Sequence, residues 1–93
     1  MKVQISWEMR EGDHEWVGSI NELTVGTIAQ AQTWIRQEIP RRESGTVEID
    51  VVYLYEIGNF VDSEGCPINH QLIGSYSPSN DQWEWNNSWK RTD

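Results

Sequence analysis

Closely spaced carboxylates are the first feature of this chain that bears on chemistry. Glu48, Asp50 and Glu56 share the parity of one predicted strand, so two of them can stand at the separation of about 5–9.5 Å that glycoside hydrolysis requires. Every acidic strand offers this spacing, and a chain of 93 residues has little room for a deep substrate cleft. We therefore expect a protein that is not an enzyme and has no catalytic residue.

One cysteine and two histidines are the other candidates for catalysis or metal binding. Cys66 stands between Gly65 and Pro67 in a predicted turn, with no helix N-terminus to lower the pKa of its thiol. His14 and His70 are far apart in the sequence and form no metal-binding motif. The chain also lacks a glycine-rich phosphate loop, a serine nucleophile elbow and a zinc-protease motif. The sequence therefore predicts neither a cofactor nor a bound metal.

The overall composition narrows the function classes further. The chain has 15 acidic and 7 basic side chains, which gives a formal charge of -8. Because contacts with phosphates come from clustered Lys and Arg, this charge argues against direct binding of nucleic acid. No apolar run approaches the roughly 20 residues of a membrane span, and residues 1–8 lack the apolar stretch of a signal peptide. We therefore expect a cytoplasmic protein that does not bind membranes.

The tryptophans are unusually numerous and unevenly spaced. Six tryptophans in so short a chain indicate a folded domain, since disordered chains are poor in aromatic residues. Trp7 and Trp34 are expected in the core. Trp83 and Trp85 flank Glu84 in a polar segment, and exposed tryptophans are frequent anchors of protein interfaces. Trp83, Glu84 and Trp85 are therefore predicted to contact a partner.

The elements that must position these residues can be read from the hydrophobic pattern. Thr27 is a predicted N-cap, Ile28, Ala31, Ile35 and Ile39 form an apolar stripe, and Pro40 is expected to end the helix. Strands are expected at residues 2–10, 15–23, 46–57, 68–76 and 82–90. One helix among four or five strands predicts a single α+β domain over residues 1–93. Its architecture is a two-layer sandwich, with the helix on a mostly antiparallel sheet in the order β-β-α-β-β-β.

The two faces of the strand over residues 46–57 decide which residues meet a partner. Val47, Ile49, Val51, Tyr53, Tyr55 and Ile57 alternate on one face, which is expected to lie under the helix. The opposite face then carries Val52 and Leu54 between the three carboxylates of this strand. We predict that Glu48, Asp50, Val52, Leu54 and Glu56 form an uncovered contact patch.

The spacing of the carboxylates sets a limit on mimicry of DNA. Side chains on one face of a strand are about 6.6 Å apart, whereas one DNA strand carries a charge for about every 3.4 Å of helix axis. Two neighbouring acidic elements, but no single strand, can therefore approach the charge density of a phosphate backbone. The sequence predicts attraction to the basic surface of a nucleic-acid-binding protein.

The segment Thr27–Ile35, TIAQAQTWI, is similar to helices of small proteins from mobile elements. With its size, acidity and order of elements, the chain resembles small phage-encoded inhibitors, and anti-CRISPR proteins in particular. The resemblance implies a stoichiometric inhibitor that occupies a Lys- and Arg-lined nucleic-acid channel of a bacterial defence complex.

Three alternatives remain open at this stage. The first is a homo-oligomeric accessory protein of a phage or mobile element, in which Val52 and Leu54 pair across a two-fold axis. The second is an immunity protein or antitoxin, which would use the same charge attraction. The third is a sugar-binding module with Trp83, Trp85 and Trp89 as its stacking platform.

Overall fold

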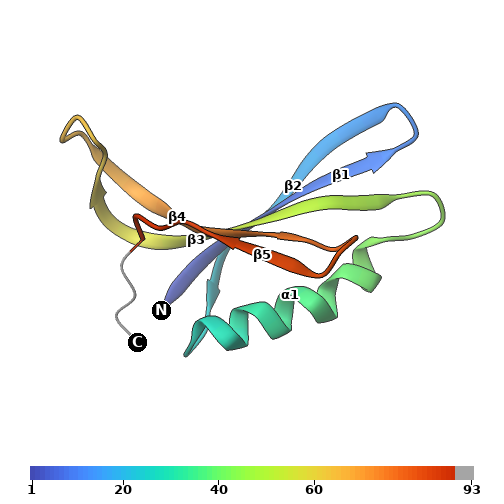
Figure 1. Ribbon diagram of the computed structural model, residues 1–93, viewed down its shortest axis with the longest axis horizontal. Coiled ribbons are helices and arrows are strands. Elements are labelled where there is room, and N and C mark those ends of the chain that lie inside the picture. The colour runs from blue at the N-terminus through green and yellow to red at the C-terminus, as the bar shows by residue number, and fades with distance from the viewer. Residues whose placement is uncertain (90–93) are drawn as a thin grey trace.

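One helix and five strands occupy most of residues 1–89, the part of the chain that the computed structural model describes (Figure 1). The elements are β1 (Lys2–Glu11), β2 (His14–Thr24), α1 (Ile28–Arg42), β3 (Glu48–Val61), β4 (Pro67–Ser77) and β5 (Gln82–Trp85). All neighbouring strands are antiparallel, and their order across the sheet is β2-β1-β3-β4-β5. The predicted α+β fold, with its order of elements, is confirmed.

Helix α1 begins where the sequence predicts and ends one turn later. The side chain of Thr27 accepts a hydrogen bond from the backbone N–H of Gln30, which confirms the N-cap. Pro40 lies inside the last turn of the helix rather than beyond its end. The backbone N–H of Glu43 still reaches the carbonyl of Ile39, so the last turn closes despite the missing N–H of the proline.

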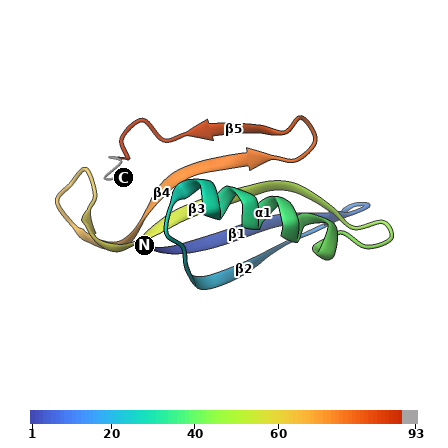
Figure 2. The same ribbon diagram turned by 90° about the horizontal axis from the view of Figure 1, so that it is seen from below.

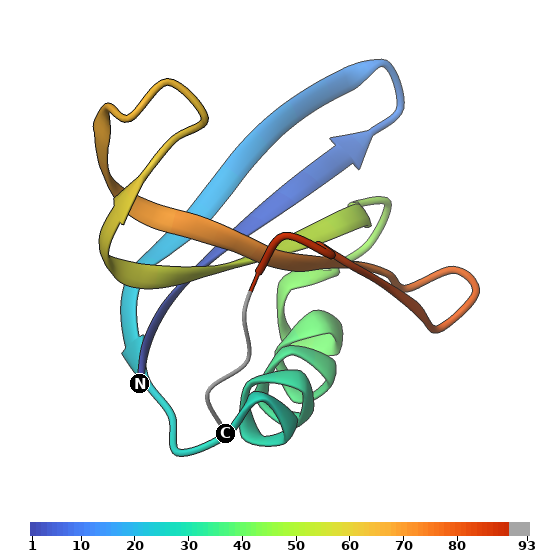
Figure 3. The same cartoon turned by 60° about the vertical axis from the view of Figure 1, so that its left-hand side comes forward.

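The helix covers one face of the sheet and leaves the other uncovered (Figures 2 and 3). Its four buried side chains, Ile28, Ala31, Ile35 and Ile39, pack on the apolar side chains of the three inner strands. The strand residues of this core are Val3, Ile5, Trp7, Ile49, Val52, Leu54, Ile73 and Tyr76. The predicted place of Trp7 in the core is confirmed, and Trp34 packs against the core from the helix.

A β-bulge in β3 reverses the predicted faces of this strand. Glu8 pairs with Val51, whereas the next residue, Met9, pairs with Ile49, so Asp50 is an extra residue in β3. Beyond the bulge the alternation changes sides, because strand side chains alternate with a period of two. Val52 and Leu54 are each 0% exposed, and the prediction that they form an uncovered patch was wrong.

The C-terminal strand is shorter than the sequence predicts. β5 ends at Trp85, and the side chain of Asn86 then donates a hydrogen bond to the carbonyl of Leu72. The chain turns there, and the buried Trp89 donates a hydrogen bond from Nε1 to Oε1 of Glu56 at 2.8 Å. The predicted strand end at Lys90 lies outside the described residues. Within residues 1–89, no helix is both long and apolar enough to cross a membrane.

Candidate protein-binding surface

The face of the sheet that lies away from α1 is a candidate surface, and we call it the open face. The strand register assigns side chains to it, because cross-strand partners point to the same side of a sheet. Its charged, aromatic and aliphatic members include Lys2, Glu8, Arg10, Glu15, Val17, Glu48, Asp50, Val51, Tyr53, Tyr55, Ile57, His70, Leu72 and Glu84. No element of residues 1–89 packs over this face (Figure 3).

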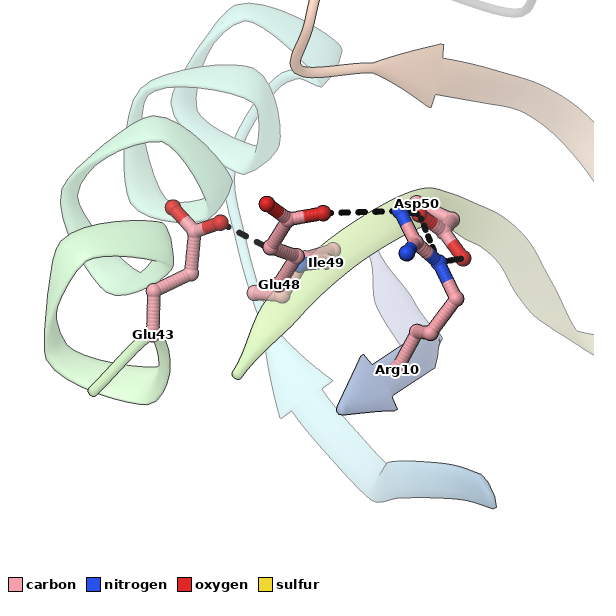
Figure 4. A network of polar contacts seen from close by, with 5 residues as sticks. All are labelled: Arg10, Glu43, Glu48, Ile49 and Asp50. Carbon is pink, nitrogen blue, oxygen red and sulfur yellow. Dashed lines mark hydrogen bonds and ion pairs between the residues drawn. The ribbon is translucent and has the colours of Figure 1, made fainter. Parts of the chain in front are cut away.

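Arg10 forms ion pairs with two of the predicted contact carboxylates at one end of the open face (Figure 4). Arg10 on β1 is opposite Glu48 in the register, and its Nη2 lies 2.7 Å from Oε2 of Glu48. Its Nε lies 3.1 Å from Oδ2 of Asp50. The hydrogen bond to Asp50, followed by the charges of both carboxylates, raises the pKa of Arg10 above its ordinary value. Because these ion pairs are exposed, they add little to folding stability.

A hollow of about 410 Å³ adjoins this ion-pair cluster. Glu43, at the end of α1, accepts a hydrogen bond from the backbone N–H of Ile49 and lines the hollow with Arg10 (Figure 4). Pro78 and Ser79, from the turn between β4 and β5, form another part of its wall. The hollow is large enough to admit a side chain of a partner beside the carboxylates.

Two tyrosines occupy the centre of the open face. Tyr53 and Tyr55 stand two residues apart on β3, with ring centroids 6.5 Å from each other. Tyr55 also meets the ring of His70 edge-on at 5.2 Å. Partial burial, followed by the charge of the neighbouring Glu8, raises the pKa of Tyr53 above its ordinary value, which keeps this phenol neutral. The open face therefore combines carboxylates with neutral aromatic rings.

The two tryptophans of β5 lie on the opposite side of the sheet, next to the core. Their cross-strand partners are Tyr76 for Trp83 and Gly74 for Trp85. The two indoles stack at 5.1 Å with an angle of 8° between their planes, and Trp83 also packs against the Tyr76 ring. Each indole thus covers a face of the other, which is unlike the flat platform of a sugar-binding site. Trp85 is nevertheless 44% exposed at the edge of the sheet.

The predicted contact residues therefore divide into three groups. Glu48, Asp50 and Glu84 share the open face. Val52 and Leu54 belong to the core, while Glu56, Trp83 and Trp85 lie on the helix-facing side. The homo-oligomer based on Val52 and Leu54 loses its contact residues in consequence.

Several members of the open face were missing from the predicted contact set. Among them are Glu8, Glu15, Val17, Val51, Tyr53 and Tyr55. The alternation of β1 did indicate that Glu8 points away from the core, since Trp7 and Met9 flank it. The tyrosines could not be found in this way, because the bulge at Asp50 has no signature in the sequence.

The residues first considered for chemistry are dispersed. Cys66 is exposed in the turn between β3 and β4, and the ring of His14 packs at a tilt against Trp16 at the other end of the molecule. Within residues 1–89, no group of three or more His, Cys, Asp and Glu side chains is placed to hold a metal ion. No protein-family model matches this chain, and no curated protein or solved structure is significantly similar to it.

Proposed function

We propose that this protein is a non-enzymatic inhibitor that binds the cationic, nucleic-acid-binding surface of another protein through its open face. The observation that carries the proposal is the charge of that face. Five carboxylates, Glu8, Glu15, Glu48, Asp50 and Glu84, share it with the guanidinium of Arg10. Lys2 also lies on this face, and its charge is balanced by an ion pair with Glu22.

The arrangement of the carboxylates supports competition with nucleic acid. Glu8 and Asp50 stand on neighbouring strands, which are about 4.7–4.9 Å apart, and both line one hollow, so two acidic strands together bring the charge density of the face closer to that of one DNA strand than a single strand can. An acidic face of this kind attracts a basic surface over a distance and raises the association rate, most steeply at low salt. Competition for a nucleic-acid channel of a bacterial defence complex, in the cytoplasm of the host, would follow from such binding.

The test is displacement of nucleic acid by a pair of charge-reversed variants. Glu15→Lys and Glu84→Lys change exposed side chains at the two ends of the open face, so the fold should survive. Fluorescence anisotropy would report the release of labelled nucleic acid from a panel of CRISPR effector complexes and other defence proteins. We expect the unaltered chain to release the nucleic acid from one of them and the double variant to be at least tenfold weaker.

Glu64→Lys combined with Asp13→Lys is the matched control, because it makes the same change of charge in two exposed turns. We expect this control to keep most of the activity. Equal loss in both double variants would mean that net charge rather than the open face matters. If no protein of the panel released its nucleic acid even at low salt, the proposal would be abandoned.

A further inference from the structure

The residues beside Tyr53 on the neighbouring strands have short side chains, and together they form one row across the open face. The two cross-strand partners of Tyr53 are serines, Ser6 on β1 and Ser75 on β4, and the partner of Ser6 on β2 is another serine, Ser19. Such short side chains leave the edges and faces of the tyrosine ring accessible from both sides. The row therefore has short side chains on both sides of one aromatic ring, Tyr53.

Carboxylates border this row on both sides of the ring. Glu8, on β1, is close enough to Tyr53 to raise the pKa of its phenol. On the other side, Glu84 on β5 is the cross-strand partner of Ser75 and continues the same row. Tyr55 adds a second ring at 6.5 Å. A ligand bound at this part of the open face thus meets aromatic rings and negative charge together.

We infer that the open face binds an arginine-rich segment of its partner, with guanidinium groups over Tyr53 and Tyr55. The inference rests on the proposed function and specifies the chemistry of the partner. A guanidinium is planar and weakly hydrated, so it stacks on an aromatic ring while its N–H groups bond to carboxylates. A lysine ammonium is compact and strongly hydrated, and it gains less from the rings.

Within the chain itself, one arginine already lies beside both a tyrosine ring and a carboxylate. The guanidinium of Arg36 on α1 lies 5.8 Å from the centroid of the Tyr76 ring. Its Nε is also 3.5 Å from Oδ1 of Asp81. A tyrosine ring and a neighbouring carboxylate thus hold one guanidinium together. The open face offers the same two groups to an arginine from outside.

A second copy of the chain fits this surface poorly. Two open faces brought together would oppose carboxylates with carboxylates, and like charges in contact are unfavourable. The apolar rings alone do not outweigh that repulsion, because they occupy only the centre of the face. Charge complementarity therefore favours a cationic partner over self-association.

The experiment compares a labelled polyarginine peptide with a polylysine peptide of equal length. Binding of each to the protein would be measured by fluorescence anisotropy at low salt and at about 150 mM salt. We expect tighter binding of polyarginine, by roughly two- to fivefold for each ring in contact. Tyr53→Leu should remove most of this preference, whereas Tyr53→Phe, which keeps the ring, should retain it.

Trp16→Leu is the control, because it removes an aromatic ring from the helix-facing side of β2. Circular dichroism would verify that each variant is folded. Equal binding of the two peptides, unchanged by Tyr53→Leu, would overturn this inference and leave the proposed function standing. Failure of both peptides to bind at low salt would instead overturn the proposed function. A dimer in sedimentation that Tyr53→Leu dissociates would show that a second copy occupies the face.

Discussion

At the scale of single residues, Gly74 determines how closely β5 approaches the sheet. A Cβ atom at Gly74 would lie 2.7 Å from the backbone oxygen of Glu84 and 2.9 Å from the indole of Trp85. Neither contact is tolerable without a shift, and the first is to backbone. The missing side chain therefore permits both the pairing of β5 and the stacking of Trp85 on Trp83.

We predict that Gly74→Ala lowers the free energy of unfolding by about 1–3 kcal/mol, the usual cost of overpacking. Chemical denaturation in urea would measure the loss. Gly18→Ala is the matched control, since the nearest atom to a Cβ there is the sulfur of Met9 at an ordinary 3.9 Å. Equal stability of the two variants would show that β5 can move away at little cost.

Asp81 stabilises the turn that precedes β5. Asp81 has a backbone φ of 51°, a conformation that few residues other than glycine adopt. Its carboxylate accepts a hydrogen bond from the hydroxyl of Tyr76 at 2.5 Å, and this bond, with help from Arg36, lowers the pKa of Asp81 below its usual 3.8. The interaction stabilises the fold above pH 3.8 and weakens as the pH falls through the lower value in the folded state.

At the scale of elements, the bulge of β3 decides which side chains are core and which are surface. Leu54→Ala should lower the free energy of unfolding by about 2–5 kcal/mol, because it leaves a cavity under the helix. Val51→Ala should cost less than about 1 kcal/mol, since Val51 is on the open face and partly exposed. Urea denaturation of both variants measures the difference. The reverse ranking would mean that β3 keeps the unbulged register.

Most elements could be predicted from the sequence because each has a local signal. The alternation of β1 and the capping Thr27 of α1 are examples, and both are confirmed. The face of β3 could not be predicted, because Val51, Val52, Tyr53 and Leu54 are all suited to either side. The choice depends on a bulge that brings Asp50 within reach of Arg10, a contact between residues forty positions apart. Val52, Leu54 and Glu56, three of the eight predicted contact residues, were misplaced for this reason.

At the scale of the whole molecule, the negative charge acts over the full length of the fold. The described chain measures 42 × 27 × 22 Å, and at about 10 mM salt the screening length is roughly 30 Å. Most carboxylates therefore repel one another across the molecule at low salt, while at about 150 mM salt the screening length is only about 8 Å. A formal charge of -8 thus opposes folding most strongly in dilute buffer.

We predict that raising NaCl from about 10 mM to about 150 mM raises the melting temperature by roughly 2–4 °C, which corresponds to about 0.5 kcal/mol for a domain of this size. Differential scanning calorimetry would measure the shift. Arg10→Gln should make the dependence on salt steeper, because it removes the cation between Glu48 and Asp50. Lys2→Gln, which removes a cation beside Glu22 only, should change it less. A melting temperature that falls with salt would mean that the ion pairs outweigh the repulsion, and the acidic face would then be less free to attract a cationic partner.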